Sequence, residues 1–447
     1  MSEKSTPMGN PECPSGANHT NGHLCFFDKS PEGITARRTY LKVFICGTLF
    51  VAVMIFTILP IYWGALYKVP VRNLEGWVVD FDGDMLGQTI SQALVQIAAQ
   101  RGRITWIPKP ASDFSRGLEN LAQDVRDERI WAAIAISPSS TTTLFSSIQI
   151  PNPAYNGSNV ITAYAVEARN EQAYRGLIRP SIDLALTTIS HQLALETTKR
   201  ASRMLSPTAL QVLSQESPQT LVAPVGYTIH NLIPFDQPVA SAATFVGMLL
   251  QLALSAFVVM VAFGARTLSG YEHSLSTTRL LILRFVSIFA GFFFISLMYC
   301  LLNLAFQLDV TRKYGHAGFV VFWMVNFLGT LATGLAIESI LILFGPKGVP
   351  FFLLLWIIVN LSATLFPIEV LPAFYRYGYG VPFYSLTKAL RTIVFGTKDR
   401  MGRTCGILIA WISISCITIP VFQWLVRRRL RVPKETPGEE KPNHDGH

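Results

Sequence analysis

Six long apolar stretches constrain the fold of this chain more than any other feature of its sequence. A helix that crosses the hydrocarbon core of a bilayer needs about 20 mainly apolar residues, because the core is roughly 30 Å thick and each residue rises about 1.5 Å. Half of the residues are hydrophobic and only 15% are charged, which leaves too little polar surface for a soluble globular protein of 447 residues. The sequence therefore predicts a membrane protein with six transmembrane α-helices, at residues 43–67, 239–264, 285–306, 319–344, 349–367 and 406–426.

Basic residues flank these stretches unevenly, and this predicts their orientation. They lie before the first stretch, around the loop between the second and third, and after the last: Arg37, Arg38, Lys42, Arg266, Arg279, Arg284, Arg427, Arg428, Arg429, Arg431 and Lys434. Cytoplasmic loops carry an excess of Lys and Arg, so both termini are expected in the cytosol. The net charge of +9 then reflects topology, and we expect no nucleic-acid partner.

This topology separates the chain into five parts. The first stretch is longer than the core of a signal peptide and follows a polar segment, so we expect a permanent anchor. The tails are rich in polar residues and lack apolar periodicity, which predicts disorder. The predicted parts are a disordered cytosolic tail (1–39), span one (40–67), a large extracytoplasmic domain (68–238), a five-span permease-like membrane domain (239–426) and a basic, disordered cytosolic tail (427–447).

The extracytoplasmic domain is predicted to be α+β. Short apolar runs alternate with segments of helical spacing, which is typical of a β-α-β-α-β opening. The expected strands cover 76–82, 104–107, 131–136 and about 160–168, and the expected helices 86–100, 118–129 and 171–205. All six cysteines lie outside this domain, so it is expected to fold without disulfides.

The acidic run Asp80-Phe81-Asp82-Gly83-Asp84 is the most conspicuous polar cluster in this domain. An EF-hand would need its glycine and glutamate elsewhere, and the run lacks the threonine expected of a phosphatase, so we interpret it as a solvated turn before a helix. No nucleophile elbow, zinc-protease pair or Walker loop occurs in the chain. The sequence predicts no catalytic, cofactor-binding or metal site and no enzyme. Cys13, His19, His23 and Cys25 match no zinc spacing.

Asn156-Gly157-Ser158 is an acceptor sequence for N-glycosylation in the predicted extracytoplasmic domain. Asn156 is therefore a candidate glycosylation site. A second match at Asn18 falls in the predicted cytosolic tail, where no sugar is expected.

Arg284 and Glu338 are charged residues near the cytosolic ends of the third and fourth spans. A charge at the centre of a membrane helix costs about 2.5–3.5 kcal/mol on insertion scales, so each is expected to find a partner. We hypothesise that they pair across neighbouring helices, with snorkelling to the interface as the alternative for Arg284. For Glu338, helix contacts and a polar pathway are both open.

A proline- and aromatic-rich segment follows the fifth span and predicts a re-entrant or interfacial element over residues 366–397. Prolines interrupt any single helix, and its aromatic residues suit the membrane interface. Lys388 and Arg391 lie here, on the side that the positive-inside rule disfavours, where phospholipid head groups are candidate contacts.

The same segment carries a resemblance to a known family. Its motif residues are Phe366, Pro367, Glu369, Leu371, Pro372, Phe374, Pro382, Phe383 and Arg391. In these residues it resembles the end of type-2 ABC-exporter permeases, and more closely the fungal nitrosoguanidine-resistance membrane protein family of YhgE/Pip-like proteins.

The resemblance implies a multi-pass protein of a fungal plasma membrane or endomembrane that confers resistance to toxic small molecules. Its expected partners are membrane lipids, a small amphipathic substrate and, by analogy with paired permeases, a second copy. A separate ATPase that docks on the cytosolic loop and a reuse of the permease shape without transport are both open. Two functions follow: export or lipid handling, and alternatively a non-transporting membrane organiser or regulator that affects resistance indirectly.

Overall fold

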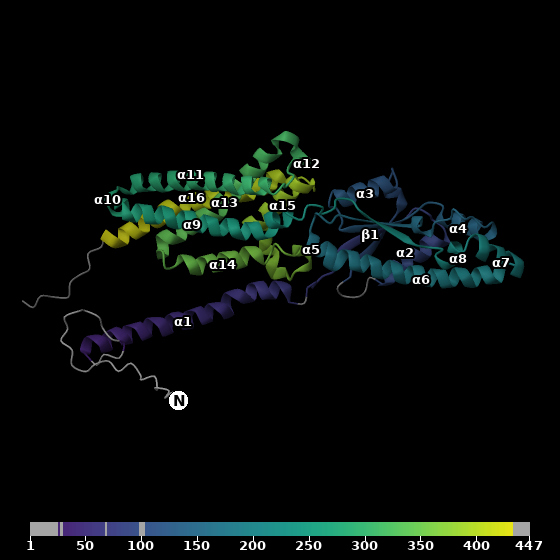
Figure 1. Ribbon diagram of the computed structural model, residues 1–447, viewed down its shortest axis with the longest axis horizontal. Coiled ribbons are helices and arrows are strands. Elements are labelled where there is room, and N and C mark those ends of the chain that lie inside the picture. The colour runs from purple at the N-terminus through teal and green to yellow at the C-terminus, as the bar shows by residue number, and fades with distance from the viewer. Residues whose placement is uncertain (1–25, 27–29, 68, 98–102, 432–447) are drawn as a thin grey trace, which may run out of the picture. The chain divides into compact units, whose positions relative to one another are not determined.

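The structure is a computed structural model that describes residues 26, 30–67, 69–97 and 103–431 (Figure 1). The chain divides into two compact units, Met1–Trp63 and Gly64–His447. Most of helix α1 (Pro31–Leu66) lies in the first unit. The expected disordered tail 1–39 is wrong for residues 31–39, which form the start of this helix. Residues 1–25, including Cys13, Asn18 and Cys25, lie outside the described residues.

The second unit contains an α/β domain built on one five-stranded sheet. Its strands lie in the order β2-β1-β3-β4-β5; β1, β2 and β3 are parallel, whereas β4 runs antiparallel to β3 and parallel to β5. The strands are β1 (Glu75–Asp80), β2 (Thr105–Lys109), β3 (Ala132–Ile136), β4 (Ile161–Ala165) and β5 (Tyr227–Asn231). Four match the expected strands closely. Pro108 lies inside β2, which an edge strand tolerates because its missing N–H leaves no central ladder bond unmade.

Helices cover both faces of this sheet (Figure 1). On one face α2 contacts β1 and β2 as well as α4 and α6, whereas α3 contacts β3 and β4 on the other face. These helices are α2 (Met85–Ile97), α3 (Leu118–Arg126), α4 (Ser140–Gln149) and α6 (Arg179–Met204). Shorter helices are α5 (Glu171–Ala173), α7 (Pro207–Glu216) and α8 (Gln219–Val222).

Alternating burial explains why the sheet has a core on each face. Val78 packs into the cluster under α2 and α6, and its neighbour Val79 packs into the cluster under α3. Every residue of β3 is buried, as expected of a central strand covered on both sides. In α6, Ile182, Leu186 and Ile189 form a buried stripe at helical spacing.

Five helices in the described residues are long and apolar enough to cross a membrane: Pro31–Leu66, Ala242–Leu268, Thr277–Ala305, Thr311–Phe344 and Met401–Arg429. The last four belong to a helical domain in the second unit. Its principal helices are α9 (Gly247–Leu268), α11 (Thr277–Ala305), α13 (Gly318–Phe344) and α16 (Met401–Arg431), and α10 (Tyr271–Ser274) and α12 (Thr311–Tyr314) are short. The protein is therefore a multi-pass membrane protein.

The structure corrects the expectation of six long spans. The fifth expected span, 349–367, contains a helix of only 13 residues, α14 (Val349–Leu361), which rises about 20 Å and is shorter than the roughly 30 Å hydrocarbon core. Short 3₁₀ helices at Ile368–Val370 and Ala373–Gly380 follow, and then α15 (Pro382–Phe395). Pro367 and Pro372 separate these pieces because proline cannot continue a helix. At the other end α16 extends to Arg431, so the expected disordered tail 427–447 is wrong for residues 427–431.

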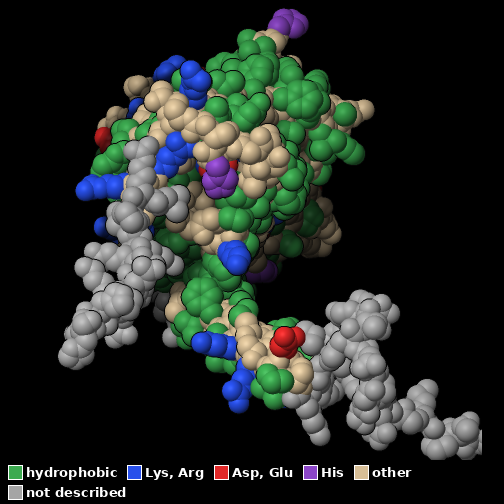
Figure 2. All heavy atoms as spheres, turned by 90° about the vertical axis from the view of Figure 1, so that its left-hand side faces the viewer, with side chains coloured by type: hydrophobic (Ala, Val, Ile, Leu, Met, Phe, Trp, Pro, Cys, Tyr) green, Lys and Arg blue, Asp and Glu red, His purple; other side chains and the backbone are tan. Residues whose placement is uncertain are grey.

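Helix α13 lies at the centre of the helical domain, where it contacts α9, α11, α15 and α16. Small residues allow this close approach. A Cβ atom on Gly329 would lie 2.7 Å from Leu386 Cδ2, and one on Gly334 would collide with Phe292. Figure 2 faces the end that carries α10 and shows hydrophobic side chains over much of the helical surface. Phe257 and Val261 of α9 are exposed, as expected of a lipid-facing surface.

Candidate functional site at the joint of the two domains

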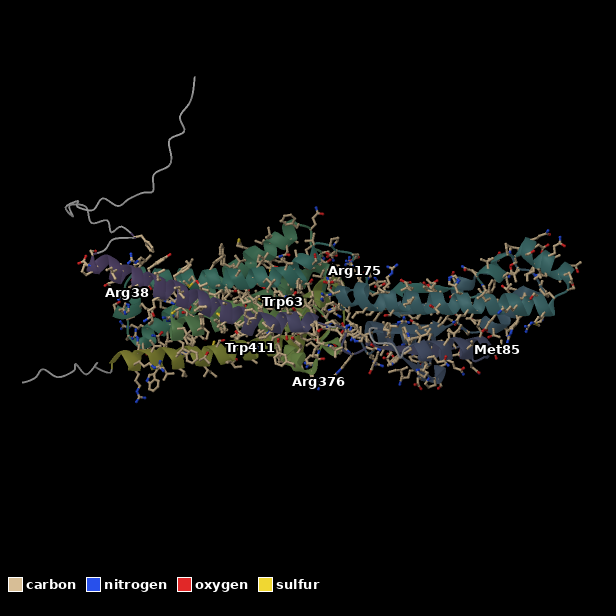
Figure 3. All side chains as sticks on the ribbon, turned by 90° about the horizontal axis from the view of Figure 1, so that it is seen from below. Arg38, Trp63, Met85, Arg175, Arg376 and Trp411 are labelled. Carbon is tan, nitrogen blue, oxygen red and sulfur yellow. The ribbon has the colours of Figure 1, made fainter. Side chains whose placement is uncertain are left out.

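The chain connections decide which end of the strands faces the helical domain. The sheet receives the chain from α1 at the amino end of β1 and returns it to α9 after the carboxyl end of β5. The amino ends of β1 to β3 and the carboxyl ends of β4 and β5 therefore lie at the same end of the sheet. At this end the backbone N–H of Val71 donates to Val370 O, at 2.9 Å. We call this region the joint: residues 69–75, 128–131, 167–171 and 235–237 against residues 309–312 and 364–400. Figure 3 shows Arg175 and Arg376 near the joint and Met85 far from it.

The motif residue Arg391 connects the two domains directly. Its Nη1 donates to the backbone oxygen of Ala168 at 2.9 Å, and its Nη2 lies 2.5 Å from Glu171 Oε2. Both side chains are more than nine-tenths buried. Arg391 is thus engaged with the α/β domain, which corrects the expectation that it contacts phospholipid head groups.

Polar and aromatic contacts extend the joint on either side of Arg391. Arg312 forms a bidentate pair with Asp236, at 2.9 and 2.8 Å. Gln237 accepts the backbone N–H of Asp309 at 2.8 Å. The rings of Phe235 and Phe395 lie 4.6 Å apart. The segment after β5 is therefore fixed to α12 and α15 before it enters α9.

Glu128 is the carboxylate around which cations gather at the joint. Its Oε2 lies 3.9 Å from Arg169 Nε, 3.9 Å from Lys388 Nζ and 3.6 Å from Arg400 Nη2. The Glu128 side chain is 4% exposed, and its backbone has a φ of +55°. A left-handed conformation costs a non-glycine residue roughly 1–2 kcal/mol, so the neighbouring structure holds Glu128 in this position.

Arg169 is held by three different contacts. Its guanidinium lies over the ring of Trp131, 3.5 Å from the centroid, and its Nη1 donates to Ile130 O at 2.7 Å. Its Nε is buried and has no hydrogen-bond partner. Burial away from water lowers the pKa of the Arg169 guanidinium, and the neighbouring Glu128 opposes that shift.

A cavity of about 470 Å³ opens beside these residues, and both domains form its wall. A second, water-sized cavity of about 20 Å³ adjoins it and shares five of its residues: Trp131, Arg169, Glu369, Tyr384 and Lys388. The Lys388 side chain lines both cavities and remains 22% exposed. We call the larger space the joint cavity.

The motif residues divide between this cavity and the helical core. Glu369 and Leu371 line the joint cavity, and Phe366 and Pro367 line the smaller one. Phe383 is buried in the helical core, whereas Phe374 is 66% exposed. Pro372 precedes a 3₁₀ helix and Pro382 begins α15. The motif therefore shapes the wall of the cavity and the break between α14 and α15.

Arg284 and Glu338 meet at the opposite end of the helical domain. Glu338 Oε1 accepts from Arg284, and from Arg266 Nη2 at 2.8 Å. Glu272 pairs with Arg284 and lies 3.4 Å from Arg266 Nε. These four residues form the buried charge cluster, in which charges of both signs balance. The expected contact between Arg284 and Glu338 is present, with Arg266 and Glu272 as additional partners.

Other predicted residues lie elsewhere. Asn156 is exposed on the α/β domain, and its Oδ1 accepts the N–H of Ser158 at 3.0 Å. Asp80 caps its own turn by accepting from the N–H groups of Asp82 and Gly83, and Asp82 accepts from the N–H of Thr141 at 3.0 Å. The acidic run thus lies at the carboxyl end of β1, at the end of the sheet opposite the joint. In the described residues, no three His, Cys, Asp or Glu side chains are grouped to hold a metal ion.

Sequence reasoning missed Glu128, Arg169 and Glu171, which supply the α/β side of the joint. They stand more than 190 positions before the motif, and nothing local distinguishes them from surface charges. The available signal was indirect: in the predicted topology Lys388 and Arg391 lay on the side that the positive-inside rule disfavours, which predicts acidic partners for them.

Comparisons with known proteins agree with this architecture. A protein of Saccharomyces cerevisiae described as an uncharacterized endoplasmic reticulum membrane protein is 27% identical over 435 residues, which cover 91% of this chain and 84% of the relative. No solved structure matches the chain. A family model described as a protein of unknown function, DUF3533, matches residues 47–417. That match covers most of both the helical and the α/β domains. The chain therefore belongs to the DUF3533 family and is a multi-pass membrane protein similar to a fungal one.

Proposed function

We propose that this protein binds an amphipathic molecule in the joint cavity and moves it by export or by lipid handling, and that resistance to toxic small molecules follows from this activity. The observation that carries the proposal is the joint cavity itself, about 470 Å³ in volume and lined by both domains. A site between two domains can open and close when they move against each other. Trp131, Tyr379 and Tyr384 add apolar surface to its charged wall.

The proposed orientation places the α/β domain outside the cytosol. The basic flanks of the helices support it, because Arg266, Arg284 and Arg427 all lie at the end of the helical domain away from the joint. There, Arg427 Nη2 donates to Leu275 O at 2.8 Å, beside the buried charge cluster. The joint cavity then lies at the outer face of the membrane. The resemblance to nitrosoguanidine-resistance proteins and to type-2 permeases also supports an α/β domain outside the cytosol.

A sixth crossing is part of this proposal, although α14 alone is too short. Glu338 near the end of α13 lies at the end opposite the joint, and α14 begins soon afterwards. The N–H of Phe383 donates to Asn360 Oδ1 at 3.2 Å, which links the end of α14 to the start of α15. Since α15 carries Arg391 at the joint, α14 together with residues 362–395 carries the chain across the helical domain.

Reconstitution tests the proposal. The full-length protein is placed in liposomes with a fluorescent anionic amphiphile or a fluorescent short-chain phospholipid, with a proton gradient, and separately with ATP and a membrane extract that supplies ATPases. We expect movement of one probe above protein-free liposomes. Absence of movement under both conditions refutes transport.

The second candidate is a membrane organiser that does not transport. The buried charge cluster favours it, because paired charges link α9, α10, α11 and α13 and resist their separation. On this proposal the protein has no enzymatic activity. Altered lipid composition or altered resistance in a deletion strain, together with no movement in liposomes, supports the organiser.

A further inference from the structure

We propose that the joint cavity is a binding site for a phosphate group, carried either by a phospholipid or by a soluble phosphate. The inference rests on the proposed function and names the ligand of the same cavity.

Positive charge predominates around the joint cavity. Six cationic side chains line it, against three carboxylates, so the formal charge of the wall is +3. The cations are Arg72, Arg129, Arg169, Arg376, Lys388 and Arg400, and the carboxylates are Glu75, Glu128 and Glu369. Low-dielectric walls strengthen the field inside such a cavity, which therefore favours an anionic ligand.

Arg169 supplies a preorganised donor. The residue is only 8% exposed, and stacking on Trp131 together with the bond to Ile130 O fixes the guanidinium plane. Its buried Nε has no hydrogen-bond partner. Leaving a charged buried donor unsatisfied is costly, so an acceptor that reaches this nitrogen gains more than it would from a solvated arginine.

The cations around Glu128 lie close together, but none of them makes a hydrogen bond to its Oε2 atom. Their nitrogens lie 3.6 to 3.9 Å from Glu128 Oε2, beyond the 2.7–3.2 Å of a hydrogen bond. Glu128 thus offsets part of their mutual repulsion without occupying their donor positions. Arg169, Lys388 and Arg400 come from the β4–α5 loop, α15 and the residue before α16, so they surround one space from different directions.

Phosphate fits this arrangement better than a carboxylate. It presents several acceptor oxygens around one centre, whereas a carboxylate presents two in a plane. Arginine forks match phosphate oxygens in bidentate geometry, and a lysine adds a point charge. A cavity with cations on several sides therefore uses the tetrahedral shape of the anion.

The test uses the full-length protein in phosphatidylcholine nanodiscs and calorimetric titration. The probes are inorganic phosphate, dihexanoyl phosphatidic acid and, as the acyl control, dihexanoylglycerol, which lacks the phosphate. We expect one or both phosphate probes to bind and the control not to bind. Lys388→Gln and Arg400→Gln are each expected to weaken binding about tenfold or more, as for a lost charge-assisted hydrogen bond. Lys313→Gln is the matched control, because Lys313 lies on the same side of the helical domain but does not line the cavity.

The results separate the sources and can overturn the inference. Binding of both phosphate probes shows that the phosphate group suffices, and binding of phosphatidic acid alone identifies a phospholipid ligand. Equal binding of dihexanoylglycerol, or no binding of either phosphate probe, overturns the inference. So does phosphate binding that neither cavity variant weakens. Transport without phosphate binding overturns this inference alone, whereas phosphate binding without transport overturns only the transport proposal.

Discussion

Replacing Arg391 with methionine is expected to loosen the joint strongly. Methionine keeps much of the length of the side chain but removes both its contacts, to Ala168 O and to Glu171. Glu171 is then left 7% exposed without its cation. Breaking a buried ion pair by removing one partner costs about 3–5 kcal/mol, because the remaining charge stays desolvated. The free energy of opening the joint should fall by about that amount.

Hydrogen exchange at Val71 measures this opening, because its amide donates across the joint to Val370 O. A loss of about 3–5 kcal/mol corresponds to exchange roughly a hundredfold to several thousandfold faster. Arg175→Met is the matched control. Its partner Glu167 is buried, but Glu167 keeps hydrogen bonds from Asn231 and from the N–H of Phe235 when Arg175 is removed. Arg175 itself is 62% exposed, so its loss should cost about 1 kcal/mol or less.

Adding Glu171→Gln to Arg391→Met should restore part of the loss, since no buried charge then lacks a partner. A coupling of about 1–3 kcal/mol is expected between two residues in contact. If Arg391→Met exchanges no faster at Val71 than Arg175→Met, or if the double variant loses the full sum of the single effects, the ion pair of Arg391 with Glu171 does not hold the joint together.

Two further outcomes are expected. Glu338→Gln removes the carboxylate shared by Arg266 and Arg284, so the free energy of unfolding in detergent should fall by about 3 kcal/mol or more. Normal abundance and stability of this variant would exclude a structural role for Glu338. Asn156→Gln should abolish an endoglycosidase-sensitive shift in the electrophoretic mobility of the protein. If the unsubstituted protein shows no such shift, glycosylation of Asn156 no longer supports the proposed orientation.

Periodicity predicts the elements that bury one regular face or both. Strands β1 and β3 and the long apolar helices were expected for this reason. Helix α4 was missed because Thr141, Thr142 and Thr143 are poor helix formers; burial of Leu144 and Ile148 overrides that preference. Strand β5 was missed because it is an edge strand with no buried residue: four of its five residues are half-buried, His230 is exposed, and the strand ends in an asparagine.

Polar side chains in the membrane helices were harder to assign than apolar ones. Asn303, Asn326 and Asn360 lie in apolar helices, where asparagine commonly forms interhelical hydrogen bonds. The amide nitrogens of all three instead donate to a carbonyl four residues earlier in the same helix. Only Asn360 also reaches a neighbouring element, through Phe383 N–H. A local acceptor is always present one turn away, so the spacing of an asparagine does not reveal its partner.

The joint also explains why cations stand where the positive-inside rule disfavours them. Outside the cytosol, on the proposed orientation, Arg391 is paired with Glu171, and Lys388 lies with Arg169 and Arg400 around Glu128. Those carboxylates belong to a domain completed before α15 in the chain, so they are available when α15 emerges. The rule concerns charges in short loops during insertion, whereas these cations are matched by tertiary contacts with a large domain. Three cations around one carboxylate still leave an excess of positive charge, and that excess faces the joint cavity, where an anionic ligand would balance it.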